Sequence, residues 1–202
     1  MKLDFEEVGV TGLTKSYGPT LALAGVDLSF EAGSVTVVQG ANGSGKSTLL
    51  WLLALLAHPT KGSIRFGKYG PGHADGLRGR IGFIAHQLQL YPGLSGRENL
   101  VLAAKLQGIP YADKRAGDLG QTLGAEEYWE RPLRTYSRGQ AQRISIARAL
   151  LHEPRLLLMD EPATGLDVKS TESFIGLIEQ EKQRGAIVII VTHESKLSLI
   201  HI

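Results

Sequence analysis

The stretch Gly40-Ala-Asn-Gly-Ser-Gly-Lys-Ser-Thr48 decides the fold of this 202-residue chain, and it fits the pattern G-x-x-x-x-G-K-[ST]. The apolar, β-branched residues 35–39 precede it and predict a buried strand. The apolar run from residue 46 to about residue 57 follows it and predicts a buried helix. A strand, a glycine-rich loop and a helix in this order aim backbone N–H groups and a helix N-terminus at an anion. The stretch therefore predicts a site for the phosphate groups of a nucleoside triphosphate.

The residue types in this loop match separate parts of that task. Its glycines allow the backbone to approach the ligand closely and to adopt positive φ angles. Lys46 is expected to reach the β- and γ-phosphates, and the Ser47 hydroxyl to bind Mg²⁺. A glycine-rich turn without a ligand is the alternative, which the flanking strand and helix disfavour. The residues expected to bind the nucleotide here are Gly40, Asn42, Gly43, Ser44, Gly45, Lys46, Ser47 and Thr48.

Length and composition exclude several other classes of protein. The chain is long enough for one domain with a full core, and its net charge of +2 gives no electrostatic case for nucleic acid. It has no cysteine, so neither disulfides nor thiolate metal sites are expected. The acidic N-terminal residues do not resemble a secretory signal. The longest apolar run, residues 49–57, is about half of the ~20 residues that a membrane span needs, so no span is expected.

Strand and helix patterns alternate along the chain and predict an α/β fold with a parallel sheet that is covered on both faces. Residues 67–79 are rich in glycine and polar side chains and predict a surface connection. Ser95 with Glu98 predicts a capping box, and Asp167 a helix cap. Strands are expected at residues 8–13, 22–30, 35–39, 63–66, 81–86, 156–159 and 186–191. Helices are expected at residues 46–57, 96–107, 113–123, 138–151 and 168–184.

The run Leu156-Leu-Leu-Met-Asp-Glu-Pro162 is the second strong signal. Its four apolar residues predict a central strand, and two carboxylates follow at the C-terminal end, where ligands bind in open α/β sheets. Asp160 is expected to hold Mg²⁺, and Glu161 to orient or activate the attacking water. A strand capped by solvated acids is the alternative, which the phosphate loop in the same chain disfavours.

The segment Tyr136-Ser-Arg-Gly-Gln140 precedes a helix pattern and is the third signal. A small hydroxyl residue and a glycine at a helix N-terminus form an anion site. Because one fold cannot readily aim two such helix ends at one γ-phosphate, we expect this end to meet a nucleotide held by another subunit. An ordinary N-capped helix is the alternative, and taken alone it is the commoner case. Tyr17, before Gly18-Pro19, is either an adenine-stacking platform or a tyrosine at a strand end.

Taken together, these motifs resemble those of the ATP-binding-cassette (ABC) ATPases, the nucleotide-binding subunits of ABC transporters, over essentially the whole chain. The match runs in the family's order. The motifs that match are the phosphate loop, Tyr17 as the adenine-stacking aromatic, Gln87 as the Q-loop glutamine, Ser137 to Gln140 as the signature, residues 159–162 as the Mg²⁺ and catalytic-acid strand, Gly165-Leu-Asp167 as the D-loop, and His193 as the switch histidine.

The resemblance implies the fold class, a P-loop NTPase core of ABC type, with a mostly parallel sheet, N-terminal antiparallel strands and a helical subdomain. It implies a single domain in which residues 1–86 and 153–202 form the nucleotide-binding core and residues 87–152 the helical subdomain. It also implies a homodimer or heterodimer of nucleotide-binding domains, an integral membrane permease as partner, no nucleic acid, and a cytoplasmic location, peripheral on the inner face of the cell membrane. Residues 88–92 and the helix after them are the expected surface for the permease.

The implied mechanism is hydrolysis of ATP with Mg²⁺ between two such domains. Ser137, Gly139 and Gln140 of one subunit complete the γ-phosphate site of the other. Gln87 binds near Mg²⁺ and the γ-phosphate, and links the nucleotide state to movement of the helical lobe. The resemblance therefore implies catalytic roles for Glu161, His193, Lys46 and Gln87, and metal contacts for Ser47, Gln87 and Asp160.

Two substitutions depart from the usual family signature, Leu-Ser-Gly-Gly-Gln: Tyr136 replaces the leucine, and Arg138 the first glycine. With His86 before Gln87 and the run of residues 91–100, they resemble the haem-exporter ATPases of cytochrome c maturation. Other exporter cassettes for lipids, peptides, drugs or ions are the alternative, because they share most of these residues. A soluble ABC ATPase is disfavoured because the chain carries one cassette and no heptads, and a subunit without turnover because Lys46 and Glu161 are present.

Overall fold

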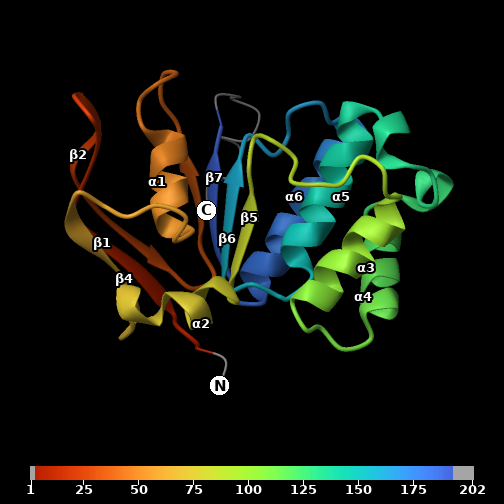
Figure 1. Ribbon diagram of the computed structural model, residues 1–202, viewed down its shortest axis with the longest axis horizontal. Coiled ribbons are helices and arrows are strands. Elements are labelled where there is room, and N and C mark those ends of the chain that lie inside the picture. Colours follow the sequence, from red (N-terminus) through yellow and green to blue (C-terminus); the bar gives the residue numbers. More distant parts are fainter. Residues whose placement is uncertain (1–2, 193–202) are drawn as a thin grey trace.

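The computed structural model describes residues 3–192 and contains two β-sheets, one antiparallel and one parallel (Figure 1). In the antiparallel sheet β1 pairs with both neighbours, and the strand order is β2 (Thr20–Glu31), β1 (Glu7–Tyr17), β4 (Lys61–Phe66). In the parallel sheet the strand order is β3 (Val35–Val38), β7 (Ile187–Val191), β6 (Leu156–Asp160), β5 (Ile81–Ile84). The predicted fold class, with a parallel sheet and N-terminal antiparallel strands, is confirmed.

The central strands β6 and β7 are buried on both faces because every one of their residues is apolar except Asp160. Successive side chains of a strand point to opposite faces, so each strand feeds two cores. On β6, Leu156 and Leu158 pack with α1 (Lys46–Leu53) and the antiparallel sheet. Leu157 and Met159 pack with the helices on the other face. The parallel sheet therefore separates two hydrophobic clusters. Figure 1 shows this sheet between α1 on one side and the later helices on the other.

The helices beyond β5 form the second layer. Both predicted N-terminal caps are confirmed: Ser95 and Glu98 form a capping box, and the Asp167 side chain accepts a hydrogen bond from the Ser170 N–H. The short 3₁₀ helices η2 (Glu126–Tyr128) and η3 (Leu133–Thr135) lie between α4 (Ala112–Thr122) and α5 (Arg138–Leu150) in the sequence. The helices of this layer are α3 (Gly96–Leu106), α4 (Ala112–Thr122), α5 (Arg138–Leu150) and α6 (Val168–Gln183). Within residues 3–192, none of the helices combines the length and the apolar character that a membrane span requires.

One expectation about local structure was wrong, and a second was incomplete. The helix predicted to reach residue 57 ends at Leu53, and Leu55 adopts a positive φ of 58°, which stops a right-handed helix. Residues 67–79 contain the 3₁₀ helix η1 (Pro71–His73) and the helix α2 (Ala74–Arg78). Leu77 of α2 is fully buried, so this segment covers the core and is more than a surface connection.

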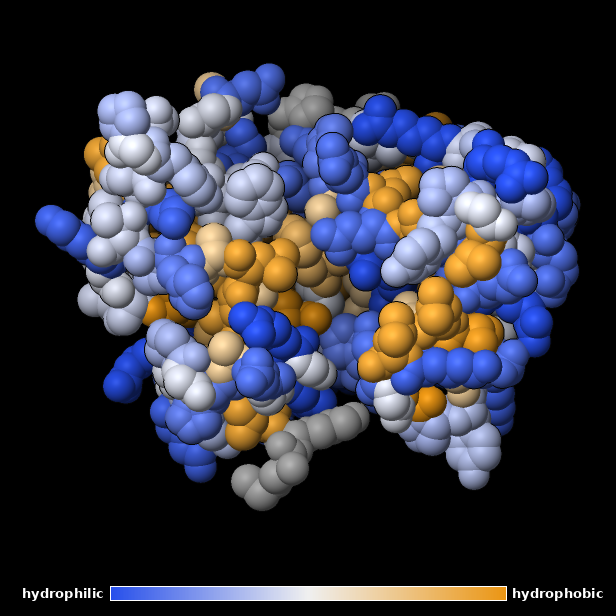
Figure 2. Space-filling view, in the orientation of Figure 1, coloured by the Kyte–Doolittle hydropathy of each residue, from blue (hydrophilic) through white to orange (hydrophobic). Residues whose placement is uncertain are grey.

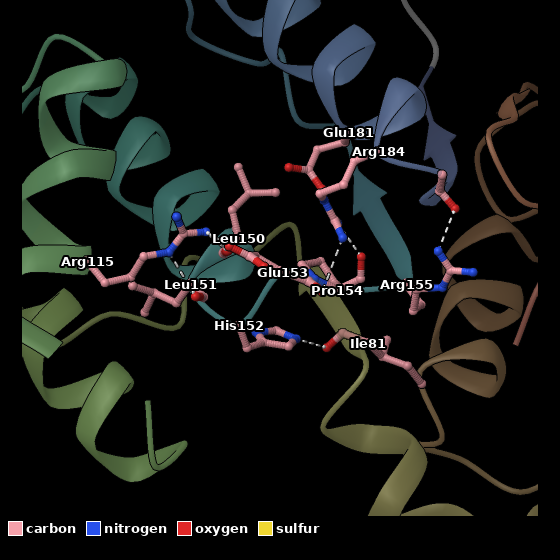
Figure 3. A network of polar contacts seen from close by, with 11 residues as sticks. Ile81, Arg115, Leu150, Leu151, His152, Glu153, Pro154, Arg155, Glu181 and Arg184 are labelled. Carbon is pink, nitrogen blue, oxygen red and sulfur yellow. Dashed lines mark hydrogen bonds and ion pairs between the residues drawn. The ribbon is translucent and has the colours of Figure 1, made fainter. Parts of the chain in front are cut away.

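The turn between α5 and β6 joins the helical layer to the parallel sheet (Figure 3). Arg115 of α4 donates hydrogen bonds to the carbonyl groups of Leu150 and Leu151, at 3.2 and 3.1 Å. These carbonyls belong to the end of α5, where helices lack internal donors. The His152 Nε2 atom lies 3.1 Å from the Ile81 carbonyl oxygen at the start of β5.

One apolar cluster also runs from the helices onto the sheet. The predicted division of the chain into a nucleotide-binding core and a helical subdomain of residues 87–152 stays a prediction.

Candidate functional site

A cavity of about 460 Å³ lies at the C-terminal end of β6, between the glycine-rich loop and β2. This is the edge of a parallel sheet at which ligands bind. The lining combines a cationic loop with two carboxylates and the first three residues of β2. Its residues are Thr20, Leu21, Ala22, Asn42, Gly43, Gly45, Lys46, Ser47, Thr48, His86, Asp160 and Glu161.

Two glycines of the glycine-rich loop lie close to other atoms of the chain. Gly45 caps α1 with a φ of 92°, and a Cβ atom there would lie 2.3 Å from the Ala22 carbonyl oxygen. A Cβ atom on Gly40 would lie 2.8 Å from the Ser44 Oγ atom. At Gly45 a larger residue would displace the backbone of β2, so the loop packs against β2 at a distance that requires glycine. At Gly40 the nearby atom is the end of the Ser44 side chain within the same loop.

Lys46 and the first turn of α1 give the cavity its positive character. The Lys46 ammonium donates hydrogen bonds to the carbonyl groups of Gly40 and Ala41, both at 2.8 Å, so it is held across the loop. The first intrahelical bond of α1 is from the Leu49 N–H to the Gly45 carbonyl at 2.9 Å. The N–H groups that precede it in a helix have no intrahelical acceptor. Together these donors can hold the oxygens of an anion.

The two carboxylates lie at the end of β6 in different environments. Asp160 is the last residue of the strand and is buried, whereas Glu161 begins the following turn. Glu161 has a φ of 53°, a conformation that non-glycine residues rarely adopt. Its N–H donates to the Val191 carbonyl at 2.9 Å, and the Thr192 hydroxyl donates to its Oε2 atom at 3.2 Å. The ends of β6 and β7 therefore position the Glu161 carboxylate at the cavity.

The residues that were predicted to hold Mg²⁺ fit that ion in their donor chemistry. Ser47 offers a hydroxyl oxygen and Asp160 a carboxylate oxygen, and both line the same cavity. Mg²⁺ binds through one or two such protein oxygens and completes its shell with water and phosphate oxygens. Gln87, the third predicted ligand, is exposed and does not line the cavity, although His86 beside it does.

The predicted signature residues lie at the start of α5, away from this cavity. Ser137 is the N-cap and forms a capping box with Gln140, at 3.2 and 2.9 Å. Gly139 faces the turn after β6, and a Cβ atom there would lie 2.6 Å from the Gly165 carbonyl oxygen. Ser137 and Gln140 line a second cavity of about 530 Å³, with residues of α6. The chain therefore does not bring its own signature to its own phosphate loop.

The structure places the remaining predicted residues as follows. Tyr17 is 43% exposed at the end of β1, with the Lys15 ammonium 4.8 Å from its ring centre, and it does not line the first cavity. Gly40 and Ser44 belong to the loop but lie outside the lining. His193 lies outside the described residues.

Sequence reasoning did not assign site roles to Thr20, Leu21, Ala22 and His86, which line the cavity. The first three belong to β2, whose contact with the loop joins residues more than twenty positions apart in the sequence. No local pattern marks such a contact. His86 could have been found, because it is the last residue of the predicted strand 81–86, whose observed counterpart β5 is parallel to β6 and ends at the same sheet edge.

The comparison with family models matches residues 23–164 to the ABC transporter family. That range includes the phosphate loop, the signature segment and both carboxylates at the end of β6.

Two curated relatives show how far the similarity extends. The lipoprotein-releasing system ATP-binding protein LolD of Nitratidesulfovibrio vulgaris is 38% identical over 93% of this chain and 86% of its own length. The sn-glycerol-3-phosphate import ATP-binding protein UgpC 2 of Agrobacterium fabrum is 36% identical over 93% of this chain. The chain spans about half, 51%, of the length of that relative.

A solved structure shares the fold with a TM-score of 0.85 and 29% sequence identity, covering 94% of this chain and 89% of the other. It is described as the dimeric structure of a post-hydrolysis state of an ATP-binding cassette bound to ADP and phosphate.

Proposed function

Because the chain belongs to the ABC transporter family, we propose that it binds ATP with Mg²⁺ and hydrolyses it to energise transport through a separate membrane permease. The observation that carries this proposal is one cavity lined by Lys46, Ser47, Asp160 and Glu161. A cation at the loop, two oxygen donors for a metal ion and a carboxylate held by its neighbours are the parts that phosphoryl transfer to water requires.

Each of these residues has a separate task in the proposed reaction. Lys46 and the N–H groups at the start of α1 bind the β- and γ-phosphates and offset their charge. Ser47 and Asp160 hold Mg²⁺, which when bound neutralises charge on the phosphate oxygens. Glu161 accepts a hydrogen bond from the attacking water and places it in line with the γ-phosphate. In this proposal His193 donates a hydrogen bond to the γ-phosphate, and Tyr17 stacks on the adenine.

A second subunit completes the site in this proposal. Ser137, Gly139 and Gln140 do not reach the cavity of their own chain, and Ser137 and Gln140 line a cavity at a different place. A helix N-terminus with a serine cap can bind the γ-phosphate of a nucleotide that another copy or a related chain holds. The similar solved structure is a dimer, which supports the same arrangement here.

The groove between the sheet and the helical layer is the proposed permease surface. Figure 2 shows hydrophobic side chains in the middle of this face and again over α3, on either side of a hollow. A cavity of about 200 Å³ in this region is lined by Leu56, Phe83, Gln89 and Arg148, among others. Gln89 lies two residues after Gln87 in the chain, so a permease segment in the groove would lie close to the loop that carries Gln87. This arrangement would place the chain in the cytoplasm, on the inner face of the cell membrane.

For the cargo we propose haem, exported for cytochrome c maturation. The support is the resemblance of Tyr136, Arg138 and His86 to that subgroup, together with residues 91–100. Export of a lipid, peptide, drug or ion is the other outcome of the test. Affinity purification from native membranes in mild detergent would recover a small helical permease and cytochrome c assembly proteins if haem is the cargo. A different permease would replace the cargo and leave the ATPase proposal intact.

The test of the ATPase proposal is release of phosphate from ATP by the purified chain, with and without its permease and with Mg²⁺ present or chelated. We expect turnover that requires Mg²⁺ and rises with the permease. ATP binding without any turnover in the complex would contradict the proposal.

A further inference from the structure

The turn that carries Glu161 needs support from other parts of the chain. A non-glycine residue at a φ of 53° is in a strained conformation, which persists only where its surroundings hold it. The next residue, Pro162, has no N–H group with which to anchor the turn. The Glu161 carbonyl accepts a hydrogen bond from the Thr164 N–H at 3.3 Å, within the turn itself. The Pro162 carbonyl is the next backbone group downstream through which another element can hold the turn.

Gln142 of α5 supplies that anchor. Its side-chain Nε2 atom donates a hydrogen bond to the Pro162 carbonyl at 2.9 Å, and the side chain is only 5% exposed. A hydrogen bond between a buried donor and a buried carbonyl is strongly favoured, because either group left unpaired costs free energy. The bond connects α5, whose first turn carries the signature residues, with the turn that carries Glu161.

Contacts on both sides of Gln142 join the same two segments. One turn earlier, Gly139 faces the Gly165 carbonyl so closely that a Cβ atom would lie at 2.6 Å. One residue later, the Arg143 guanidinium donates to the Ser170 hydroxyl and lies 3.7 Å from the Asp167 carboxylate. The first two turns of α5 and residues 161–170 are therefore held together at three successive points.

We propose that Gln142 is a positioning residue for Glu161. Through Gln142, the position of the Glu161 carboxylate depends on the position of the N-terminus of α5. This inference rests on the proposed ATPase function. In the proposed dimer the start of α5 meets the partner's nucleotide, so its docking is passed through Gln142 to the Pro162 carbonyl and to Glu161. Gln142 is buried and does not line the cavity, so its proposed effect on the reaction is indirect.

The test is the steady-state turnover and the ATP affinity of the permease complex that carries Gln142→Met. Methionine keeps the length of the side chain and the helix propensity but cannot donate to the Pro162 carbonyl. We expect kcat to fall by about tenfold or more, because small misplacements of a catalytic group have effects of this size. The dissociation constant for ATP should change by less than about twofold, since the phosphate loop is untouched. Gln142→Leu serves in the same way if the methionine variant does not fold.

Two controls separate positioning from general loss of structure. Ser145, also buried on α5, has a hydroxyl without a hydrogen-bond partner among the described residues, so Ser145→Ala should leave kcat unchanged. In a Glu161→Asp background the side chain is one methylene shorter, so the carboxylate is already displaced from its position. Adding Gln142→Met to this background should lower kcat by less than about a further twofold.

The outcomes distinguish this inference from the proposed function. An unchanged kcat in a folded Gln142→Met variant, beside an active wild-type complex, would overturn the positioning role alone. The same factor lost in the wild-type background and in the Glu161→Asp background would also overturn it, because Gln142 would then act independently of the carboxylate. Absence of turnover in the wild-type complex would overturn the proposed function and this inference with it.

Discussion

The Thr192 hydroxyl donates a hydrogen bond to the Glu161 Oε2 atom at 3.2 Å, across the C-terminal ends of β6 and β7. Thr192 is buried, and its own N–H donates to the Val38 carbonyl at 3.3 Å, at the end of β3. The Glu161 side chain is thus connected to the strand that leads into the glycine-rich loop. This connection ties the proposed catalytic carboxylate to the phosphate-binding element of the same cavity.

Thr192→Val is expected to lower kcat by about tenfold, because a hydrogen bond to a charged group contributes about 1.5–3 kcal/mol. Valine has nearly the same shape and cannot donate. The ATP dissociation constant should stay unchanged, and Thr192→Ser, which keeps the hydroxyl, should stay within about twofold of wild type. A valine variant with wild-type kcat would show that this bond does not position Glu161.

Lys46→Ala is expected to abolish measurable ATP binding, because it removes the side-chain cation that the phosphate loop contributes to the cavity lining. Equilibrium binding of radiolabelled ATP with Mg²⁺ measures the effect. Lys61→Ala is the matched control, since Lys61 is exposed on β4 and does not line the cavity. Equal loss of affinity in both variants would contradict the role given to Lys46.

Gly45→Ala and Gly43→Ala separate backbone strain from steric contact. Both glycines have a positive φ, 92° and 80°, but only a Cβ atom on Gly45 meets another atom closely. We expect Gly43→Ala to cost about 1 kcal/mol of unfolding free energy from strain alone. Gly45→Ala should cost clearly more, because the Ala22 carbonyl must move. Denaturant unfolding without nucleotide measures both, and equal costs would disprove the close contact between the loop and β2.

Tyr136→Phe is expected to destabilise the fold by about 1–3 kcal/mol, because it leaves two polar groups without their partner. The Tyr136 hydroxyl donates to the Tyr128 carbonyl at 2.6 Å and accepts from the Gly96 N–H at 3.1 Å. Denaturant unfolding at neutral pH checks this value. An unchanged free energy of unfolding would mean that water replaces the hydroxyl.

The same hydroxyl predicts a pH dependence. Burial raises the pKa of Tyr136, and burial likewise raises the pKa of Tyr128. A raised pKa in the folded state means that the unfolded chain loses these protons first. The stabilisation should therefore be complete below pH about 10, the ordinary tyrosine pKa, and be lost as the pH rises through the folded-state values. Tyr136→Phe should make this alkaline loss smaller, and an identical alkaline profile would contradict it.

The elements that were predicted well depend on local patterns. Ser95 and Asp167 mark helix starts because capping is decided within four residues, and both caps are present. The prediction of β6 needed only its own apolar run. The end of α1 at Leu53 and the burial of Leu77 depend on packing against distant segments, which the local sequence does not encode.

The candidate site was predictable only in part for the same reason. Lys46, Ser47, Asp160 and Glu161 were found because their motifs are short, and the structure brings them to one cavity. The β2 residues of the lining reach the loop through a long-range contact that leaves no motif.

The two departures from the usual signature likewise make contacts that the local sequence does not indicate. Tyr136, in place of leucine, has a structural explanation, since its hydroxyl joins Gly96 at the start of α3 with the Tyr128 carbonyl. Arg138 packs its side chain against Gly165. Neither contact was indicated by the sequence, because each joins segments that are distant along the chain.

The most direct test of the proposed mechanism is phosphate release from ATP by the wild-type complex and by its Glu161→Gln variant, measured beside their ATP affinities. Glutamine keeps the shape of the side chain but cannot act as a base. We expect the variant to bind ATP as tightly as wild type and to lose turnover by at least about a hundredfold. Undiminished turnover in Glu161→Gln would contradict the central claim that this carboxylate activates the attacking water.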